Sequence, residues 1–586
     1  METPRKRSTL SLVNSLLEAK DRRRLATSVG LIVIGSLLEA VSLGIVIPVV
    51  RAVTDGDQRL GSRWLPDVIQ SLPFDLYVRL LMLCLVLAFF VKNAYLVLSS
   101  YYQQRVQLSI SNRLVQRMFE RYIQQSYEFH LTHSSALLLR NVQEYSSAVI
   151  TNAIGPGLSL VAELLTGLGF FAVVLWVNPT ATILLISTFA LVTYVVLSRT
   201  RQRTKRWGAD RVVQRGLQSE TLLAGFWGIK EIKVFGREGD IVDTHRSSLH
   251  AAGTYVHKFG LLQSIPRAIF EVMAVGAAAL VVIAESISGG DVGSATLTIA
   301  LFGVVTFRML PAANRIVSSF QQFSFGRAGI EGAVESFSLP AAVIGTGGVT
   351  DPIRFEHLRV SDLKYRYPRT EEFVIDVQAL SVTAGESVGV IGTSGSGKST
   401  LVDLLIGMLT PTSGRIEVNG QDSAGVARSW MNCIGYVPQF VYLMDTTIRR
   451  NVAFGLPTDE IDDSKVEVAL RAASLWDFVN ELPGAAETIV GERGVRLSGG
   501  QRQRLGIARA LYIEPQVLVF DEATSALDDE TEQEIVESIR KLAQDRTVIT
   551  VAHRTTTLRH CSRILRLEKG RIVADGNPSE VLGSFK

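Results

Sequence analysis

Residues Gly392-Thr-Ser-Gly-Ser-Gly-Lys-Ser399 fit the pattern G-x-x-x-x-G-K-[ST] and decide the fold of the second half of the chain. The pattern follows the apolar run Val388–Ile391, which predicts a buried strand, and precedes Thr400–Met408, which predicts an apolar helix. Glycines let backbone N–H groups curl around phosphates, and the helix N-terminus adds its positive end. The predicted phosphate-binding residues are Gly392, Ser394, Gly395, Gly397, Lys398, Ser399 and Thr400.

A second short apolar run, Val517–Phe520, ends in the acidic pair Asp521 and Glu522. Two acids after a strand can simply be solvated, but together with a phosphate-binding loop they form a Walker B arrangement. Asp521 and Ser399 are then expected to bind Mg²⁺, Lys398 to reach the β- and γ-phosphates, and Glu522 to polarise the attacking water. The sequence therefore predicts an α/β P-loop ATPase domain that uses ATP and Mg²⁺.

Between these motifs stands Leu497-Ser-Gly-Gly-Gln501, and on this stretch the chain resembles the ABC transporter ATPases. The resemblance implies that Ser498, Gly499 and Gly500 of one subunit close over the γ-phosphate held by the other. A serine hydroxyl, glycine N–H groups and a helix N-terminus suit an anion. Because the catalytic position Glu522 is intact, a homodimer with two equivalent active sites is the natural interpretation.

Other motifs of the same family follow in the expected order, and each implies a role. Gln439 resembles the Q-loop residue, which also contacts Mg²⁺, and His553 resembles the switch histidine at the γ-phosphate; Asp528 resembles the D-loop aspartate. Tyr367 resembles the aromatic residue that stacks on adenine, with Tyr365 as a near alternative.

The first half of the chain has the composition of a membrane protein. Hydrophobic residues make up 47% of the 586 residues, and the mean hydropathy is +0.24. A bilayer core requires about 20 apolar residues per helix. Six stretches are predicted to span it: Leu25–Val50, Leu76–Leu98, Leu158–Val177, Ala181–Leu197, Ala268–Ile287 and Val292–Leu310.

The connections between these spans alternate in length and charge. The turns after the third and fifth spans are short and contain no Lys or Arg, whereas Ser99–Pro156 and Ser198–Pro266 are long and basic. The positive-inside rule places the long segments, and with them both termini and the ATPase domain, in the cytoplasm. Each long segment is expected to extend the spans as helices and to reverse near His130–Ser135 or Gly225–Gly228. The predicted location is the inner, or plasma, membrane.

The predicted organisation is a membrane domain over residues 1–337, a linker over 338–352 and the ATPase domain over 353–586. The basic N-terminal tail directly precedes a span, so nucleic acid is not expected as a partner. A secretory signal fits poorly, because the apolar run is too long and no cleavage site follows promptly. The cysteines, Cys84, Cys433 and Cys561, are too far apart in sequence to indicate a zinc site or a disulfide framework.

Five charged residues fall within apolar runs: Glu39, Lys92, Glu163, Glu271 and Arg308. Charges at such depth usually face a cavity or a partner, although some snorkel or pair with one another. Arg308 and Glu39 are the candidate substrate contacts. The loop Asp55–Phe74 is either an amphipathic helix on the outer membrane surface or an ordinary packed loop.

A membrane domain followed by an ATPase domain on one chain is typical of exporters. Val490-Gly-Glu-Arg-Gly494 and Gly225–Glu238 also resemble segments of exporters. The loop Asp55–Phe74, the stretch Glu231–Glu238 and the run Gly491–Gly506, the last of which is shared widely among exporters, are most similar to bacterial flippases of lipid-linked oligosaccharides used in protein glycosylation. The resemblance implies a lipid-linked oligosaccharide, or a related lipid, moved from the cytoplasmic to the outer leaflet. The alternatives are a multidrug or lipid-A-type exporter, and a membrane ATPase that regulates rather than transports. Six spans exclude a soluble ABC ATPase.

Overall fold

The computed structural model describes residues 8–54, 73–177, 179–287, 292–340, 353–523, 532–534, 536, 537, 540 and 546–583. The chain divides into two compact units. One comprises Met1–Ile123 and His133–Pro340, and the other comprises Gln124–Thr132 and Ala341–Lys586. The short piece Gln124–Thr132 comes from the first half of the sequence, yet it belongs to the unit that contains the ATPase motifs. Most of the predicted linker 338–352 lies outside the described residues.

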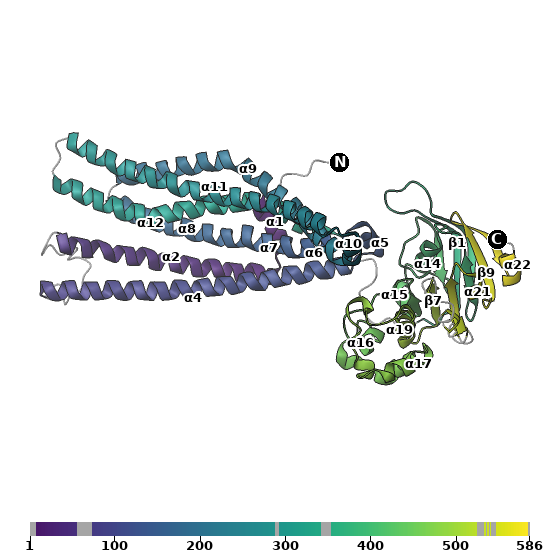
Figure 1. Ribbon diagram of the computed structural model, residues 1–586. Helices are drawn as coiled ribbons and strands as arrows, with labels where there is room; N and C mark the ends of the chain where they lie inside the picture. Colours follow the sequence, from purple (N-terminus) through teal and green to yellow (C-terminus); the bar gives the residue numbers. More distant parts are fainter. Residues whose placement is uncertain are drawn as a thin grey trace. The chain divides into compact units, whose positions relative to one another are not determined.

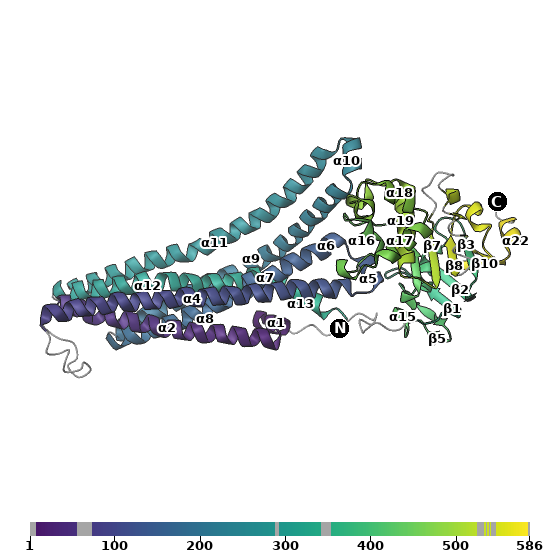
Figure 2. The same ribbon diagram turned by 90° about the horizontal axis from the view of Figure 1, so that it is seen from below.

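The first unit consists mainly of long helices that run side by side in both views (Figures 1 and 2). They are α2 (Ala19–Thr54), α4 (Phe74–Ile123), α8 (Gly155–Val177), α9 (Pro179–Trp227), α11 (Glu238–Ile287) and α12 (Val292–Phe325), and each contains one predicted span. Within the described residues, three segments are long and apolar enough to cross a membrane: Ala19–Ser42, Phe74–Ile123 and Ser135–Gly169. A 50-residue helix such as α4 is about 75 Å long, far more than the roughly 30 Å of a bilayer core, so it continues well beyond the membrane.

Shorter helices complete the first unit: α1 (Thr9–Leu16), α6 (Ser135–Arg140), η1 (Asn141–Tyr145), α7 (Ser146–Val149), η2 (Ile150–Ile154), α10 (Ile229–Phe235) and α13 (Arg327–Ser338). Both predicted reversals contain a short helix rather than a simple turn. The first is α5 (Tyr127–Thr132), and the second is α10, which ends at Gly236 in the left-handed conformation (φ 62°). Glycine adopts this conformation without the steric cost that a side chain adds, so the chain can turn there into α11.

Two sheets form the core of the second unit. The antiparallel sheet has the order β2-β1-β4-β5, and the mostly parallel sheet has the order β10-β9-β3-β8-β7-β6. The strands are β1 (His357–Tyr365), β2 (Ile375–Thr383), β3 (Ser387–Ile391), β4 (Ser413–Val418), β5 (Gln421–Asp422), β6 (Ile434–Val437), β7 (Val517–Asp521), β8 (Thr547–Val551), β9 (Arg563–Glu568) and β10 (Arg571–Gly576). Strands β7 and β8 are buried throughout, as expected for the middle of a covered parallel sheet.

Helices and helical turns surround the parallel sheet. They are α14 (Lys398–Leu405), α15 (Ala427–Asn432), α16 (Ile448–Val452), η3 (Thr458–Glu460), α17 (Asp463–Ala472), α18 (Trp476–Glu481), η4 (Ala485–Glu487), η5 (Glu492–Gly494), α19 (Gly499–Tyr512), α21 (Thr555–Leu558) and α22 (Pro578–Gly583). The apolar face of α19, including Leu505, Ile507 and Leu511, packs in one core cluster with Leu518 and Phe520 of β7. This packing ties the helix that follows the Leu497–Gln501 motif to the strand that carries the acidic pair.

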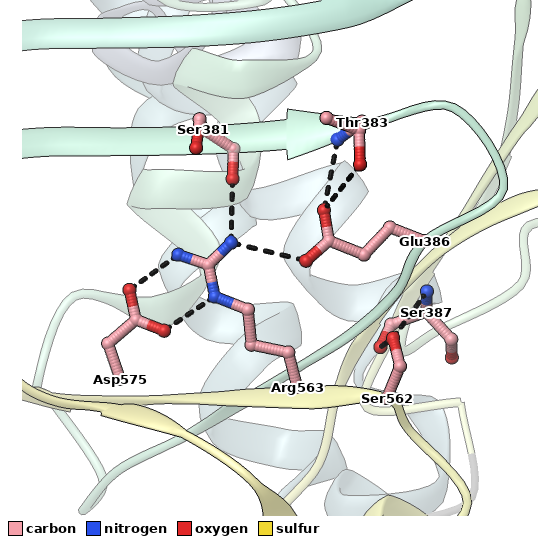
Figure 3. Close-up of polar contacts among 7 residues, drawn as sticks. All are labelled: Ser381, Thr383, Glu386, Ser387, Ser562, Arg563 and Asp575. Atoms are coloured by element: carbon pink, nitrogen blue, oxygen red, sulfur yellow. Dashed lines mark hydrogen bonds and ion pairs between the residues drawn. The ribbon is translucent and has the colours of Figure 1, made fainter.

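Arg563 on β9 connects the two sheets (Figure 3). Its guanidinium donates two hydrogen bonds of 2.5 Å to Asp575 on β10, one of 3.1 Å to Glu386 and one of 3.0 Å to the carbonyl of Ser381 on β2. Glu386 in turn accepts from the backbone N–H of Thr383. These partners raise the pKa of Arg563 above its usual value. The bidentate pair joins β9 to β10 within the mostly parallel sheet, and the hydrogen bond to Ser381 links that sheet to β2 of the antiparallel one.

Candidate functional site

The candidate site lies at the carboxyl edge of the parallel sheet. Strands β3, β8, β7 and β6 are neighbours in that order, and all are parallel. The phosphate-binding loop follows β3, His553 follows β8, the acidic pair ends β7 and begins the next loop, and Gln439 follows β6. Parallel strands place their carboxyl ends at one edge, so four segments far apart in the sequence meet there.

Glycine geometry shapes the loop between β3 and α14. Gly395 and Gly397 have φ values of 78° and 99°, which side-chain-bearing residues rarely adopt. A Cβ at Gly392 would lie 2.3 Å from the carbonyl oxygen of Leu567. Lys398 Nζ donates hydrogen bonds of 3.1 Å to the carbonyls of Gly392 and Thr393, and burial lowers its pKa. The ammonium group is therefore held against the loop that is predicted to surround the phosphates.

Glu522 is the point where the four segments converge. Its carboxylate accepts a 2.8 Å hydrogen bond from Gln439 Nε2, lies 2.5 Å from His553 Nε2 and lies 3.7 Å from Lys398 Nζ. Glu522 itself has a positive φ of 49°, a strained backbone conformation for a residue other than glycine. The three catalytic predictions, Glu522, Gln439 and His553, are thus brought together by direct contacts.

Two of the three side chains predicted for Mg²⁺, those of Ser399 and Asp521, also meet, whereas the third, Gln439, contacts Glu522. Ser399 Oγ donates a 3.3 Å hydrogen bond to Asp521, and Tyr436 OH lies 3.5 Å from the other carboxylate oxygen. Burial, and then the neighbouring Glu522, raise the pKa of Asp521. In the loop, the buried hydroxyl of Ser396 has no hydrogen-bond partner among the described residues. A hydroxyl and a carboxylate beside a loop of backbone N–H groups fit a nucleotide phosphate with its hard, oxygen-seeking cation.

The two aromatic candidates have different surroundings. Tyr367 OH lies 3.0 Å from Thr400 Oγ1 at the start of α14, next to the phosphate-binding loop. Tyr365 is buried, and its hydroxyl donates a 3.1 Å hydrogen bond to Glu128 on α5. Burial and the Glu128 carboxylate raise the pKa of Tyr365. Position beside the loop favours Tyr367 for adenine stacking, while Tyr365 joins α5 to β1.

Ser498 begins the helix α19 as its N-cap. Its hydroxyl accepts from the Gln501 backbone N–H, while the Gln501 side chain accepts from the Ser498 backbone N–H, which is a complete capping box. These hydrogen bonds stay within the helix terminus, and Gly499 and Gly500 follow in its first turn. The structure therefore does not connect Ser498–Gly500 with Lys398 through any contact among the described residues. Asp528 lies outside the described residues.

The candidate substrate residues are placed only in part. Glu39 is buried where α2 packs on α8, and it accepts a 3.0 Å hydrogen bond from Thr166, which lies 3.3 Å from Ser36. Arg308 belongs to α12, but its side chain lies outside the described part of the structure. Glu163 on α8 pairs with Arg315 on α12. Two of the intramembrane carboxylates thus connect helices of one chain.

Sequence reasoning missed two contributions to these contacts. Thr166 is a hydroxyl within an apolar span and carries no pattern that predicts a carboxylate partner. Glu128 lies in a polar connection and acts on Tyr365, 237 residues away in sequence. No local signal could have identified either one.

Comparison with known proteins gives the family. Residues 376–525 match the model of the ABC transporter family, and residues 31–309 match the model of the ABC transporter transmembrane region. The chain is 30% identical over 472 residues to the ATP-dependent lipid A-core flippase of Thiobacillus denitrificans, covering 79% of this chain and 78% of that protein. It is 31% identical over 503 residues to the flippase of the same name from Chromohalobacter salexigens, covering 83% of each.

A solved structure of a bacterial Atm1-family ABC exporter with ATP bound covers 96% of each chain, with a TM-score of 0.77 and 26% sequence identity. The fold, the two matched family models and the similar proteins all point to the same family. The chain belongs to the ABC exporters, as a half-transporter whose ATPase domain couples ATP hydrolysis to translocation across a membrane.

Proposed function

We propose that this exporter is a flippase for a phosphorylated, multiply acylated lipid of the lipid A type, and that it moves this lipid from the inner to the outer leaflet of a bacterial inner membrane. The observation that carries the proposal is the similarity to ATP-dependent lipid A-core flippases, which extends over about four fifths of both chains. The specific resemblance to lipid-linked oligosaccharide flippases receives no support from these relatives. One of its three features, the loop Asp55–Phe74, lies almost entirely outside the described residues.

In the proposed ATPase reaction Glu522 is the general base. Its carboxylate is positioned by Gln439 and His553, and it takes a proton from the attacking water. Lys398 neutralises phosphate charge, and Ser399 and Asp521 are the pair that would hold Mg²⁺. The metal would supply further charge neutralisation at the phosphates when bound.

The working unit of the proposal is a homodimer with the ATPase domains in the cytoplasm. Ser498 has its hydrogen bonds within its own helix terminus, and the backbone N–H groups at that terminus suit a phosphate brought by a second subunit. The basic segments that follow the second and fourth spans support the orientation.

Reconstitution in sealed vesicles tests the cargo. Vesicles with the purified dimer receive one of three fluorescent probes: hexa-acylated lipid A, an undecaprenyl-pyrophosphate oligosaccharide or an amphipathic cationic drug. ATP should move lipid A across the bilayer faster than the other two probes. Vesicles with Glu522→Gln protein serve as the control for passive leakage. ATP-dependent movement of the oligosaccharide or the drug, with lipid A left in place, would overturn the proposal.

A further inference from the structure

The membrane unit contains a cavity of about 1180 Å³ that the sequence motifs do not indicate. Its lining comes from the start of α1, from α8, from Tyr194–Lys205 of α9 and from Phe320–Ser324 of α12, with Arg327 at the beginning of α13. The cavity belongs entirely to the first unit, and neither Glu39 nor any residue of the ATPase site lines it.

Position along α9 places the cavity at one membrane boundary. The helix begins at Pro179 and rises about 1.5 Å per residue. Tyr194 therefore lies about 22 Å from that end, Arg201 about 33 Å and Lys205 about 39 Å. Because the bilayer core is about 30 Å thick, the cavity extends from the hydrocarbon into the headgroup layer on the side opposite the start of α9. In the proposed orientation this is the cytoplasmic boundary.

The lining has two chemically different ends. Leu160, Val161 and Leu197 provide apolar surface on the hydrocarbon side. Arg201 and Lys205, one helical turn apart, provide two positive charges at the headgroup level. Within the described part of the chain, neither cation has a carboxylate at ion-pair distance. The third cation differs, because Arg327 pairs with Glu331 at 2.7 Å.

Gln321 gives an independent indication that the cavity takes a polar ligand. The side chain lines the cavity and is only 1% exposed. Neither its amide oxygen nor its amide nitrogen has a hydrogen-bond partner among the described residues. A buried amide without partners is unfavourable, and native proteins rarely leave one unsatisfied unless the site has a function. The group can donate and accept at once, which suits a phosphorylated sugar with its hydroxyl and amide groups.

We infer that this cavity binds the phosphorylated headgroup of the lipid in the inner leaflet, before translocation. Arg201 binds phosphate oxygens with its planar fork, Lys205 adds a second charge, and Gln321 hydrogen-bonds the sugar beside them. The apolar lining covers the first part of the acyl chains. The inference rests on the proposed function, because it requires a phosphoryl lipid as cargo.

Binding of labelled lipid A to the nucleotide-free dimer in nanodiscs tests the inference. The variant Arg201→Ala/Lys205→Ala should bind lipid A at least about tenfold more weakly, which corresponds to the loss of one good charge-assisted contact. Its affinity for the dephosphorylated lipid should stay the same. The matched control is Arg203→Ala/Arg206→Ala, which removes the same charge from the same helix at residues that do not line the cavity. This control should bind within about twofold of the wild type.

A second variant separates ligand binding from a purely structural role. Gln321→Leu should weaken lipid A binding several-fold and leave the melting temperature and dimer content equal or higher, because it removes an unsatisfied buried group. A lower melting temperature or loss of the dimer would instead assign the Gln321 amide to a partner copy and overturn its role here.

The two hypotheses fail in different ways. Wild-type protein that binds and moves no phosphoryl lipid would contradict the proposed function itself. Wild-type protein that binds lipid A, together with an Arg201→Ala/Lys205→Ala variant that binds it as well as the control pair does, would overturn only the assignment of the cavity.

Discussion

Glu522 shows how much of the ATPase site depends on one side chain. Its carboxylate contacts Gln439, His553 and Lys398, which follow three different strands, and its own backbone has a positive φ. A strained residue persists only where its surroundings compensate for the strain. We therefore expect the negative charge of Glu522 to be needed for the chemistry. We expect the size and hydrogen bonds of its side chain to be needed to hold the segments around Gln439, His553 and Lys398 together.

Replacing Glu522 by Gln keeps the shape and removes the base. ATP turnover by Glu522→Gln should fall by about 10²–10⁴-fold, the usual contribution of a general base. Nucleotide binding should remain close to that of the wild type, and the ATP-bound dimer should accumulate. Phosphate release and equilibrium binding of a fluorescent ATP analogue measure the two effects separately. Turnover within tenfold of the wild type would show that another group is the base.

Asp403 on α14 provides a pH prediction. Burial, and then the nearby Asp521, raise the pKa of Asp403 to about 6, compared with about 3.9 for an unfolded aspartate. The folded state thus holds this proton more tightly, so the stability associated with Asp403 is present at low pH and is lost as the pH rises from about 4 to about 6. Asp403→Asn should melt at a higher temperature than the wild type at pH 7.5.

The same variant provides its own control at lower pH. Near pH 4 Asp403 is protonated in the folded state and about half protonated in the unfolded state, so most of the difference in melting temperature between Asp403→Asn and the wild type should disappear. The comparison requires protein without nucleotide and with a metal chelator, because a cation would change the charge near Asp521. Equal melting temperatures at pH 7.5 would contradict the raised pKa.

Among the elements, α5 stands out because a six-residue helix from the first half of the sequence belongs to the ATPase unit. The hydrogen bond from Tyr365 to Glu128 connects it to β1, two residues before Tyr367. Tyr365 and Tyr367 also lie edge to face, with ring centroids 5.2 Å apart. Tyr367, the candidate for adenine stacking, is therefore linked to α5 through two direct contacts.

Cutting this connection should separate ATP use from transport. Glu128→Ala should raise the number of ATP molecules hydrolysed per lipid moved by about threefold or more, which corresponds to the loss of roughly one hydrogen bond to a charged group. Basal ATPase activity should stay within about twofold. Glu128→Gln is the matched control, because its amide oxygen can still accept from Tyr365 OH. Paired flipping and phosphate-release assays would refute the connection if the Ala and Gln variants behaved alike.

Features whose residues are neighbours in the sequence could be predicted from it, whereas contacts between residues far apart in the sequence could not. The phosphate-binding loop and the acidic pair were recognisable because motif and apolar strand are adjacent in sequence, as at Ile391–Gly392 and Phe520–Asp521. The six long helices were recognisable because each span is a continuous apolar run. The Glu128–Tyr365 contact was not, because only the fold brings these residues together. Gln321 was not either, because an unsatisfied amide has no sequence pattern.

At the scale of the whole transporter, the position of Ser498 makes a prediction about how two chains cooperate. Its hydroxyl is engaged in its own capping box, and the described residues show no contact between it and Lys398. If it acts on the nucleotide of the other chain, a dimer of one Lys398→Ala chain and one Ser498→Arg chain keeps one intact site. This dimer should exceed either mutant homodimer by about tenfold or more in ATP turnover, since one lost phosphate contact costs about 10²-fold.

The opposite pairing is the control for this experiment. A wild-type chain paired with a chain that carries both Lys398→Ala and Ser498→Arg has one lesion in each site, so it should be inactive. Purified mixed dimers with two different affinity tags allow each pairing to be measured alone. Activity in the control pairing and none in the first would show that Ser498 serves the nucleotide of its own chain.

The membership of α5 also changes how this protein can be divided. The ATPase unit is discontinuous: nine of its residues, Gln124–Thr132, enter it from a stretch whose two flanks belong to the helical bundle. A recombinant fragment that starts at residue 353 therefore lacks a piece of its own unit and loses the acceptor for the buried Tyr365 hydroxyl. A protease that cuts between residues 341 and 352 severs the covalent link to the C-terminal part of the unit, and α5, which stays on the other fragment, is then held to that part only by non-covalent contacts such as the Tyr365–Glu128 hydrogen bond. Solubility screens and limited digestion of this exporter should be planned around a bipartite module rather than around a C-terminal domain.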